Sequence, residues 1–95
     1  MMSITTVAQV PTEHGSKYLQ QLCKHWSHKL PVEFDAQRGV VTFPNAVATM
    51  EADDAVLTVT LAVEEADMVE RMQGVVASHV DRFAFREAPL PFDWK

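Results

Sequence analysis

The chain has 95 residues, of which 47% are hydrophobic, and a formal net charge of −5 at pH 7. This length predicts one domain spanning residues 1–95, and the acidic balance with scattered basic residues argues against nucleic acid as a partner. The lone cysteine excludes an internal disulfide and fits a reducing compartment, while no apolar run approaches the roughly 18 residues of a membrane span.

A strand followed by a half-buried helix is predicted at the start of the chain. Residues 3–10 carry β-branched side chains and end at Pro11, which favours a strand near a sheet edge. Thr12 is placed to cap a helix over residues 13–29, which Pro31 ends. The apolar face of this helix recurs at the helical period and comprises Tyr18, Leu19, Leu22, Cys23, Trp26 and Leu30.

Four strands are predicted next, over residues 32–35, 40–43, 46–51 and 55–63, with turns at 36–39, Pro44–Asn45 and Asp53–Asp54. The last stretch, AVLTVTLAV, is the strongest strand pattern in the chain. One face carries Leu57, Val59, Leu61 and Val63, and the other, less hydrophobic face carries Val56, Thr58, Thr60 and Ala62. This less hydrophobic face is still apolar enough to pair with a second subunit or a partner domain, so a homodimer is one possible assembly.

A second helix is predicted from about residue 64 to Arg86, because acidic residues favour helix initiation at its start. Its apolar face contains Met68, Val69, Met72, Val75, Val76, Val80 and Phe83, with His79 among them. The tail EAPLPFDWK has two prolines and two large aromatic residues. We expect it to be an extended segment held by Phe92 and Trp94.

The order of these elements predicts an α+β fold. It is a two-layer sandwich, with a mainly antiparallel sheet of about five strands and two helices on one face. Four intervening strands leave the two helices antiparallel, whereas a bulge in place of the turn at Pro44 would leave them parallel. In the antiparallel arrangement, His25 and His79 lie on the order of 10 Å apart along the helix axis. This spacing disfavours a metal ion shared by these two histidines but permits a pocket lined from both sides.

The candidate ligand-binding residues are His25, His28, His79 and Arg82. His25 and His28 are three residues apart on the predicted helix, so they could share a divalent metal ion. Alternatively, they are simply solvent-exposed polar residues beside the apolar face of the helix. His79 needs a polar partner among its apolar neighbours, either as a core histidine or as the floor of a pocket.

Arg82 and Arg86 could hold a carboxylate or phosphate group, or could pair with Asp81, Glu87 or Asp93. Cys23 lies on the apolar face and is expected to be a core residue. No glycine-rich phosphate loop, CxxC pair or nucleophile elbow is present in the sequence, so we assign no catalytic residue.

The stretches KYLQQLCKHWSHK and HVDRFAFRE resemble the small bacterial family catalogued as domain of unknown function 2218. The resemblance extends from Thr12 to Trp94, and Trp26 stands where phenylalanine is the more usual aromatic. The matching residues are Tyr18, Leu19, Cys23, Lys24, His25, Trp26, His28, Lys29, His79, Arg82, Phe83, Glu87 and Trp94.

This resemblance carries no established activity, but similar domains occur beside siderophore-interacting flavoproteins that reduce ferric chelates. It therefore implies an association with iron acquisition and such a reductase as a partner. We expect a cytoplasmic, non-catalytic domain that binds a ligand or partner. Two alternatives remain open. One is a metal-binding protein using His25 and His28, and the other is a small enzyme with His79 as general base.

Overall fold

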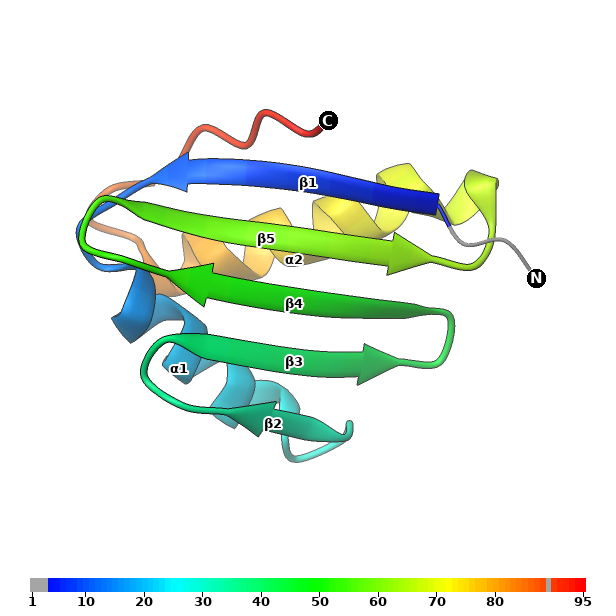
Figure 1. Cartoon of the computed structure of the whole chain (residues 1–95), viewed down its shortest axis with the longest axis horizontal. Helices are drawn as coiled ribbons and strands as arrows, with labels where there is room; N and C mark the ends of the chain where they lie inside the picture. Colours follow the sequence, from blue (N-terminus) through cyan, green and yellow to red (C-terminus); the bar gives the residue numbers. More distant parts are fainter. Residues whose placement is uncertain (1–3, 89) are drawn as a thin grey trace.

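A computed structural model describes residues 4–88 and 90–95, and its fold is the predicted α+β sandwich (Figure 1). The strands are β1 (Ile4–Pro11), β2 (Val32–Phe34), β3 (Arg38–Phe43), β4 (Ala46–Ala52) and β5 (Val56–Val63). The helices are α1 (Gly15–Trp26), the 3-10 helix η1 (Ala66–Met68) and α2 (Val69–Phe83). All neighbouring strands pair antiparallel in the order β1-β5-β4-β3-β2, which confirms the predicted five-stranded sheet.

Several predicted boundaries differ from the observed ones. The helix predicted over residues 13–29 is observed at Gly15–Trp26, and the second predicted helix begins as η1 and ends at Phe83 instead of Arg86. The position before α1 is His14 and makes no side-chain cap, so the prediction that Thr12 caps this helix was wrong. The first residue of the first predicted strand, Ser3, lies outside the described residues.

The core lies between the sheet and the helices. The four alternate residues Leu57, Val59, Leu61 and Val63 of β5 have no exposed surface, as their spacing predicts. Leu19, Leu22 and Cys23 of α1 are equally buried against this face. Each buried leucine or valine contributes about 1.5–3 kcal/mol relative to an exposed one, so this layer is the main source of stability.

Two aspartates fix the hairpin turns at one end of the sheet. The Asp53 carboxylate accepts hydrogen bonds from the backbone N–H groups of Ala55 and Val56, at 2.8 and 2.7 Å. Asp35 accepts equivalent bonds from Gln37 and Arg38, at 2.8 and 2.9 Å. These bonds stabilise the ionised carboxylates and lower the pKa of both groups. The predicted turn at Asp53 is therefore confirmed.

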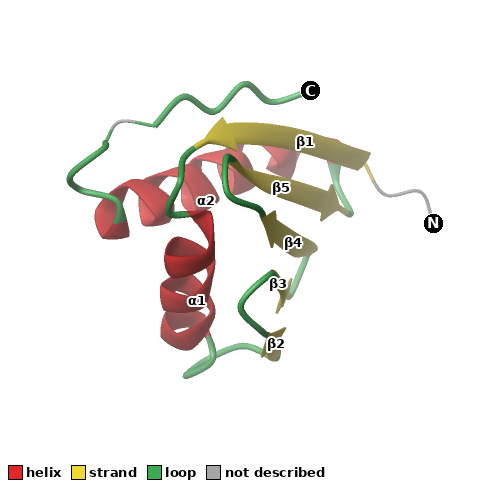
Figure 2. Cartoon of the chain, turned by 60° about the vertical axis from the view of Figure 1, so that its left-hand side comes forward, coloured by secondary structure: helices red, strands yellow, loops and turns green. Residues whose placement is uncertain are grey.

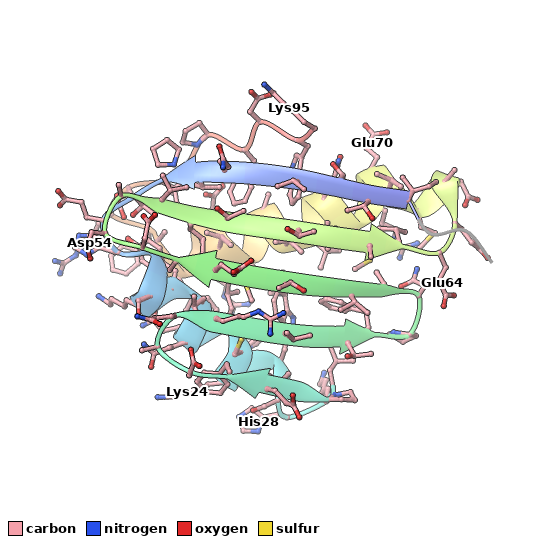
Figure 3. The ribbon with its side chains drawn as sticks, in the orientation of Figure 1. Lys24, His28, Asp54, Glu64, Glu70 and Lys95 are labelled. Atoms are coloured by element: carbon pink, nitrogen blue, oxygen red, sulfur yellow. The ribbon has the colours of Figure 1, made fainter. Side chains whose placement is uncertain are left out.

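The C-terminal segment runs along the free edge of β1, as Figures 1 and 3 show. Trp94 forms a β-bridge with Ala8, and the Lys95 N–H donates to the Val7 carbonyl at 2.8 Å. The rings of Phe92 and Trp94 stack with centroids 5.7 Å apart, and both side chains pack against the core. The prediction that these two aromatic residues hold an extended tail is confirmed.

Both helices lie on the same face of the sheet, and their axes are steeply inclined to each other, as Figure 2 shows. Four strands separate α1 from α2, as predicted. However, because the helices do not lie side by side along their lengths, spacing along one helix axis does not measure the distance between their side chains. No helix in residues 4–88 and 90–95 is long and apolar enough to span a membrane.

Candidate functional site

His25 and His79 lie next to one another where the two helices meet. Their ring centroids are 5.7 Å apart, with the ring planes tilted by 46°. The expected separation on the order of 10 Å was therefore wrong, because it assumed antiparallel helices packed along a common axis. His25 is exposed and His79 is half-buried, so solvent reaches at least one edge of the pair.

Two aromatic rings complete this group, and a third ring packs against one of them. The Phe83 ring lies 5.8 Å from the His25 ring, and the Trp26 ring lies 5.1 Å from the His79 ring, measured between centroids. Phe43 of β3 packs edge-on against Trp26 at 5.2 Å. We call His25, Trp26, His79 and Phe83 the imidazole–aromatic cluster. Trp26 is only 7% exposed and Phe83 is half-buried, so this cluster reaches from the core to the surface.

A backbone hydrogen bond sets the orientation of His79. Its Nδ1 lies 2.6 Å from the carbonyl oxygen of Val75, one helical turn earlier. Because a carbonyl only accepts, Nδ1 carries the proton and the neutral ring keeps its lone pair on Nε2. The predicted polar partner of His79 is thus a backbone carbonyl. Among the described residues, no protein hydrogen bond is made to Nε2.

His28 lies outside the cluster. The helix α1 ends at Trp26, and residues 27–29 form turns in which the Lys29 and Leu30 N–H groups donate to the Trp26 carbonyl. His28 is exposed, and Figure 3 shows it at the β2 side of the molecule. The helical spacing that favoured a pair with His25 therefore ends before His28 is reached.

Arg82 is exposed in the last turn of α2, where the helix macrodipole favours a cation. Within residues 4–88 and 90–95, the one ion pair joins Lys95 and Asp93 at 3.7 Å. Asp81 instead accepts a hydrogen bond from the Leu90 N–H at 3.1 Å, and the Arg86 guanidinium lies 5.8 Å from the centroid of the Phe85 ring. In the part of the chain that the structure describes, the alternative in which Arg82 and Arg86 pair with Asp81, Glu87 or Asp93 is therefore not observed.

A second polar cluster was missed by sequence reasoning. The buried Tyr18 hydroxyl donates to the Glu87 carboxylate, to which the Thr12 hydroxyl also lies close, at 3.0 Å from Oε2. Burial, followed by the hydrogen bond and charge of Glu87, raises the pKa of Tyr18 to about 12. The Tyr18 hydrogen bond lowers the pKa of Glu87, with Thr12 and the nearby His14 acting in the same direction. This cluster ties the end of α2 to the start of α1.

The only sequence signal for this second cluster was a tyrosine on an apolar helix face, since a buried hydroxyl requires a partner. That requirement does not say which residue supplies the carboxylate. Cys23, by contrast, is buried as expected, and its burial raises the pKa of the thiol to about 11.

Metal-ligand chemistry is limited by the number of donors that lie together. Across the described ranges 4–88 and 90–95, no group of three or more His, Cys, Asp or Glu side chains lies close enough to hold a metal ion. The histidine pair of the imidazole–aromatic cluster supplies two nitrogen donors at most. Its chemistry is therefore that of a surface that combines aromatic faces with two imidazole rings.

A scan against protein families matches residues 7–95 to DUF2218, described as an uncharacterized protein conserved in bacteria. The chain belongs to the DUF2218 family. It is also similar to a solved structure, the NMR structure of PA4090 from Pseudomonas aeruginosa, with 32% sequence identity and a TM-score of 0.81. This match covers 96% of the chain and 94% of PA4090. A search of the curated proteins found no match.

Membership in DUF2218 confirms the resemblance carried by the two motif stretches. Both stretches contribute to the imidazole–aromatic cluster, because His25 and Trp26 come from the first and His79 and Phe83 come from the second. Tyr18 and Glu87 of the other polar cluster also come one from each stretch. The two motifs of this chain thus meet in space twice, at the imidazole–aromatic cluster and at the partly exposed Glu87 carboxylate.

Proposed function

We propose that this protein is a cytoplasmic, non-catalytic binding domain and that the imidazole–aromatic cluster is the centre of its binding surface. The observation that carries the proposal is the meeting of His25, His79 and Phe83 at a partly exposed junction of two helices. Aromatic side chains with polar edges supply large contact area with directed hydrogen bonds, which is the composition of binding hot spots.

The end of α2 adds further binding groups beside the cluster. Phe85 is 72% exposed two residues after Phe83, and Arg82 and Arg86 are exposed on either side of it in sequence. Phenylalanine and arginine are both enriched in the cores of protein interfaces. This combination favours a protein partner that presents an apolar contact and acidic groups.

The proposed partner is a siderophore-interacting flavoprotein reductase of the same bacterium, to which this domain would be an accessory in iron acquisition. This choice rests on the association that the family resemblance implies and on the basic and aromatic character of the α2 end. Such a partner would bind through the surface around the imidazole–aromatic cluster, while the flavoprotein carries the redox chemistry.

Calorimetric titration of the purified reductase with this protein tests the proposal. We expect His25→Ala to weaken binding by about 10-fold, as removal of an interface anchor does. His28→Ala is the matched control, because His28 is an exposed histidine outside the cluster, and it should leave binding unchanged. The absence of binding by the wild-type protein, or equal losses in the two variants, would contradict the proposal.

A second candidate function is favoured by the hydrogen bond of His79. An imidazole whose Nδ1–H is held by the Val75 carbonyl presents Nε2 as a proton acceptor, which is the arrangement of a general base. Diethyl pyrocarbonate reacts with an accessible unprotonated imidazole nitrogen and tests this enzyme hypothesis. A general base at His79 should react faster than the solvated His28, and slower reaction would remove this candidate.

A further inference from the structure

We infer that His25 and His79 form a two-histidine site for a divalent transition-metal ion of the cobalt-to-zinc series. This inference deepens the proposed function and rests on the same cluster as the binding surface. It replaces the expected His25–His28 pair on one helix with a pair that joins α1 to α2. The inference rests on the short distance between the two imidazole rings.

The separation of the rings fits shared coordination. With a metal–nitrogen bond of about 2.0–2.1 Å, the centroid of a ligating imidazole lies roughly 3.2 Å from the ion. Two such rings lie about 5.2 Å apart at the tetrahedral angle and approach about 6.4 Å as that angle widens toward linear. The observed centroid separation of 5.7 Å lies within this range.

The hydrogen bond of His79 is a second, independent observation. Histidines that bind metals generally donate their other ring N–H to a carboxylate, backbone carbonyl or water, which fixes the tautomer and the ring orientation. The Nδ1 of His79 donates in this way to the Val75 carbonyl at 2.6 Å, so Nε2 is the nitrogen available to an ion. Imidazole nitrogen suits ions of this series better than it suits magnesium or calcium.

The surroundings define an open site. Trp26 and Phe83 flank the two imidazoles on the protein side, and the exposed His25 borders solvent. Since two histidines fill two positions, the remaining positions of a bound ion would be taken by water or by a donor group of an incoming molecule. A metal held in this way would add a coordination bond to the contacts of the proposed binding surface.

Quenching of Trp26 fluorescence by Cu²⁺ tests the site directly, because the Trp26 ring lies 5.1 Å from His79. The Trp94→Phe background removes the other of the two tryptophans. His25→Phe and His79→Phe keep an aromatic ring in the cluster and remove the nitrogen ligand. Each should raise the Cu²⁺ concentration for half-maximal quenching by about 10-fold or more, whereas His28→Phe should leave it unchanged.

Calorimetry with Zn²⁺ and Ni²⁺ on the same variants gives a second readout without fluorescence, and circular dichroism verifies that each variant is folded. Absence of Cu²⁺ quenching in the Trp94→Phe protein would overturn the inference. Equal losses in His25→Phe and His28→Phe, with none in His79→Phe, would overturn it in favour of the single-helix pair. The two proposals can fail separately. If Cu²⁺ quenching is absent but reductase binding persists in metal-free buffer and still depends on His25, the metal site is overturned and the proposed function stands.

Discussion

Gly39 is the residue at which the contact between α1 and the sheet is least tolerant of added atoms. A Cβ atom at this position would lie 2.6 Å from the Cys23 Sγ, well inside the van der Waals distance, while Phe34 and Leu19 would be in ordinary contact at 3.4 and 3.5 Å. We therefore expect Gly39→Ala to lower the free energy of unfolding by about 1–3 kcal/mol, measured by urea denaturation.

The matched test of this explanation is the double variant with Cys23→Ala. Removal of Sγ leaves space that the new methyl group at residue 39 occupies, so the two substitutions should compensate instead of adding. We expect a coupling energy of about 1 kcal/mol or more in the double-mutant cycle. Additive losses would show that the thiol is not the obstacle.

The Tyr18–Glu87 contact predicts a stability that depends on pH at both extremes. Since folding raises the pKa of Tyr18 from 10.0 to about 12, its contribution is complete below pH 10 and is lost as the pH rises toward 12. Folding lowers the pKa of Glu87 from 4.5, so its contribution is present above pH 4.5 and is lost as the pH falls through the lowered value.

Unfolding free energies of wild-type protein and Tyr18→Phe, measured from pH 9 to pH 12, test the alkaline limb. The wild-type curve should fall more steeply between pH 10 and 12 than the variant curve, because phenylalanine has no proton to lose. Glu87→Gln should likewise flatten the acid limb below pH 4.5. Parallel curves for wild type and Tyr18→Phe would show that the tyrosine proton contributes nothing to the pH dependence.

At the scale of elements, the C-terminal segment protects the edge strand β1. Leu90 is 8% exposed and its N–H is held by Asp81, and Trp94 pairs with Ala8. Trp94→Ala should release residues 90–95 and cost about 1–2 kcal/mol, because it removes both aromatic packing and support for the backbone bridge. Chymotrypsin should then cleave after Phe92 more quickly than in the wild-type protein.

The matched variant for the tail is Asp81→Ala, which removes the hydrogen bond to Leu90 but leaves the aromatic residues in place. It should accelerate cleavage less than Trp94→Ala does, because packing of Phe92 and Trp94 persists. If cleavage after Phe92 is as slow in Trp94→Ala as in the wild-type protein, Trp94 does not hold the segment.

Elements were predictable from the sequence because each carries its own periodic signal. The alternation of Leu57, Val59 and Leu61 marks a strand with one buried face, and the spacing of Leu19, Leu22 and Trp26 marks a helix. The end of α1 was less predictable, since the apolar spacing continues to Leu30 while the regular helix stops at Trp26.

The candidate site was only partly predictable. The sequence named His25 and His79 as candidates but placed them on the order of 10 Å apart, because the angle between two helices on a sheet depends on packing and sheet twist. Neither helix records that angle in its own residues. For the same reason, the sequence indicated that Tyr18 needed a partner but not that Glu87 supplies it.

At the scale of the whole molecule, the face of the sheet opposite the helices is open, and Figures 1 and 3 view the molecule from this side. Val56, Thr58, Thr60 and Ala62 of β5 are half-buried on it, and strand register places Val47 and Thr49 of β4 beside them. Charged side chains gather at one end, where a hollow of about 460 Å³ is lined by residues including Arg38, Glu51 and Asp53.

The uncharged patch on this open face, formed by Val47, Thr49, Val56, Thr58, Thr60 and Ala62, favours a second copy of the chain as its occupant. Val47 is 36% exposed and pairs in register with Ala62, so an apolar side chain lies at the surface of the patch. A two-fold axis through the uncharged patch would place the two charged ends on opposite sides. We therefore expect a homodimer with the two sheets packed face to face.

Val47 is 36% exposed on this patch. Val47→Lys should convert the dimer to a monomer, because it places a charge in the middle of the sheet-to-sheet contact. Sedimentation velocity at high protein concentration measures the change. Ser78→Lys is the control of equal charge, since Ser78 is exposed on α2 and lies away from the open face, and it should remain dimeric. A wild-type protein that stays monomeric, or a Val47→Lys protein that stays dimeric, contradicts pairing through the sheet.

Because the imidazole–aromatic cluster lies on the helical side, a dimer of this kind would carry two outward-facing copies of the proposed binding surface. A bivalent partner would therefore bind the dimer more tightly than it binds the Val47→Lys monomer.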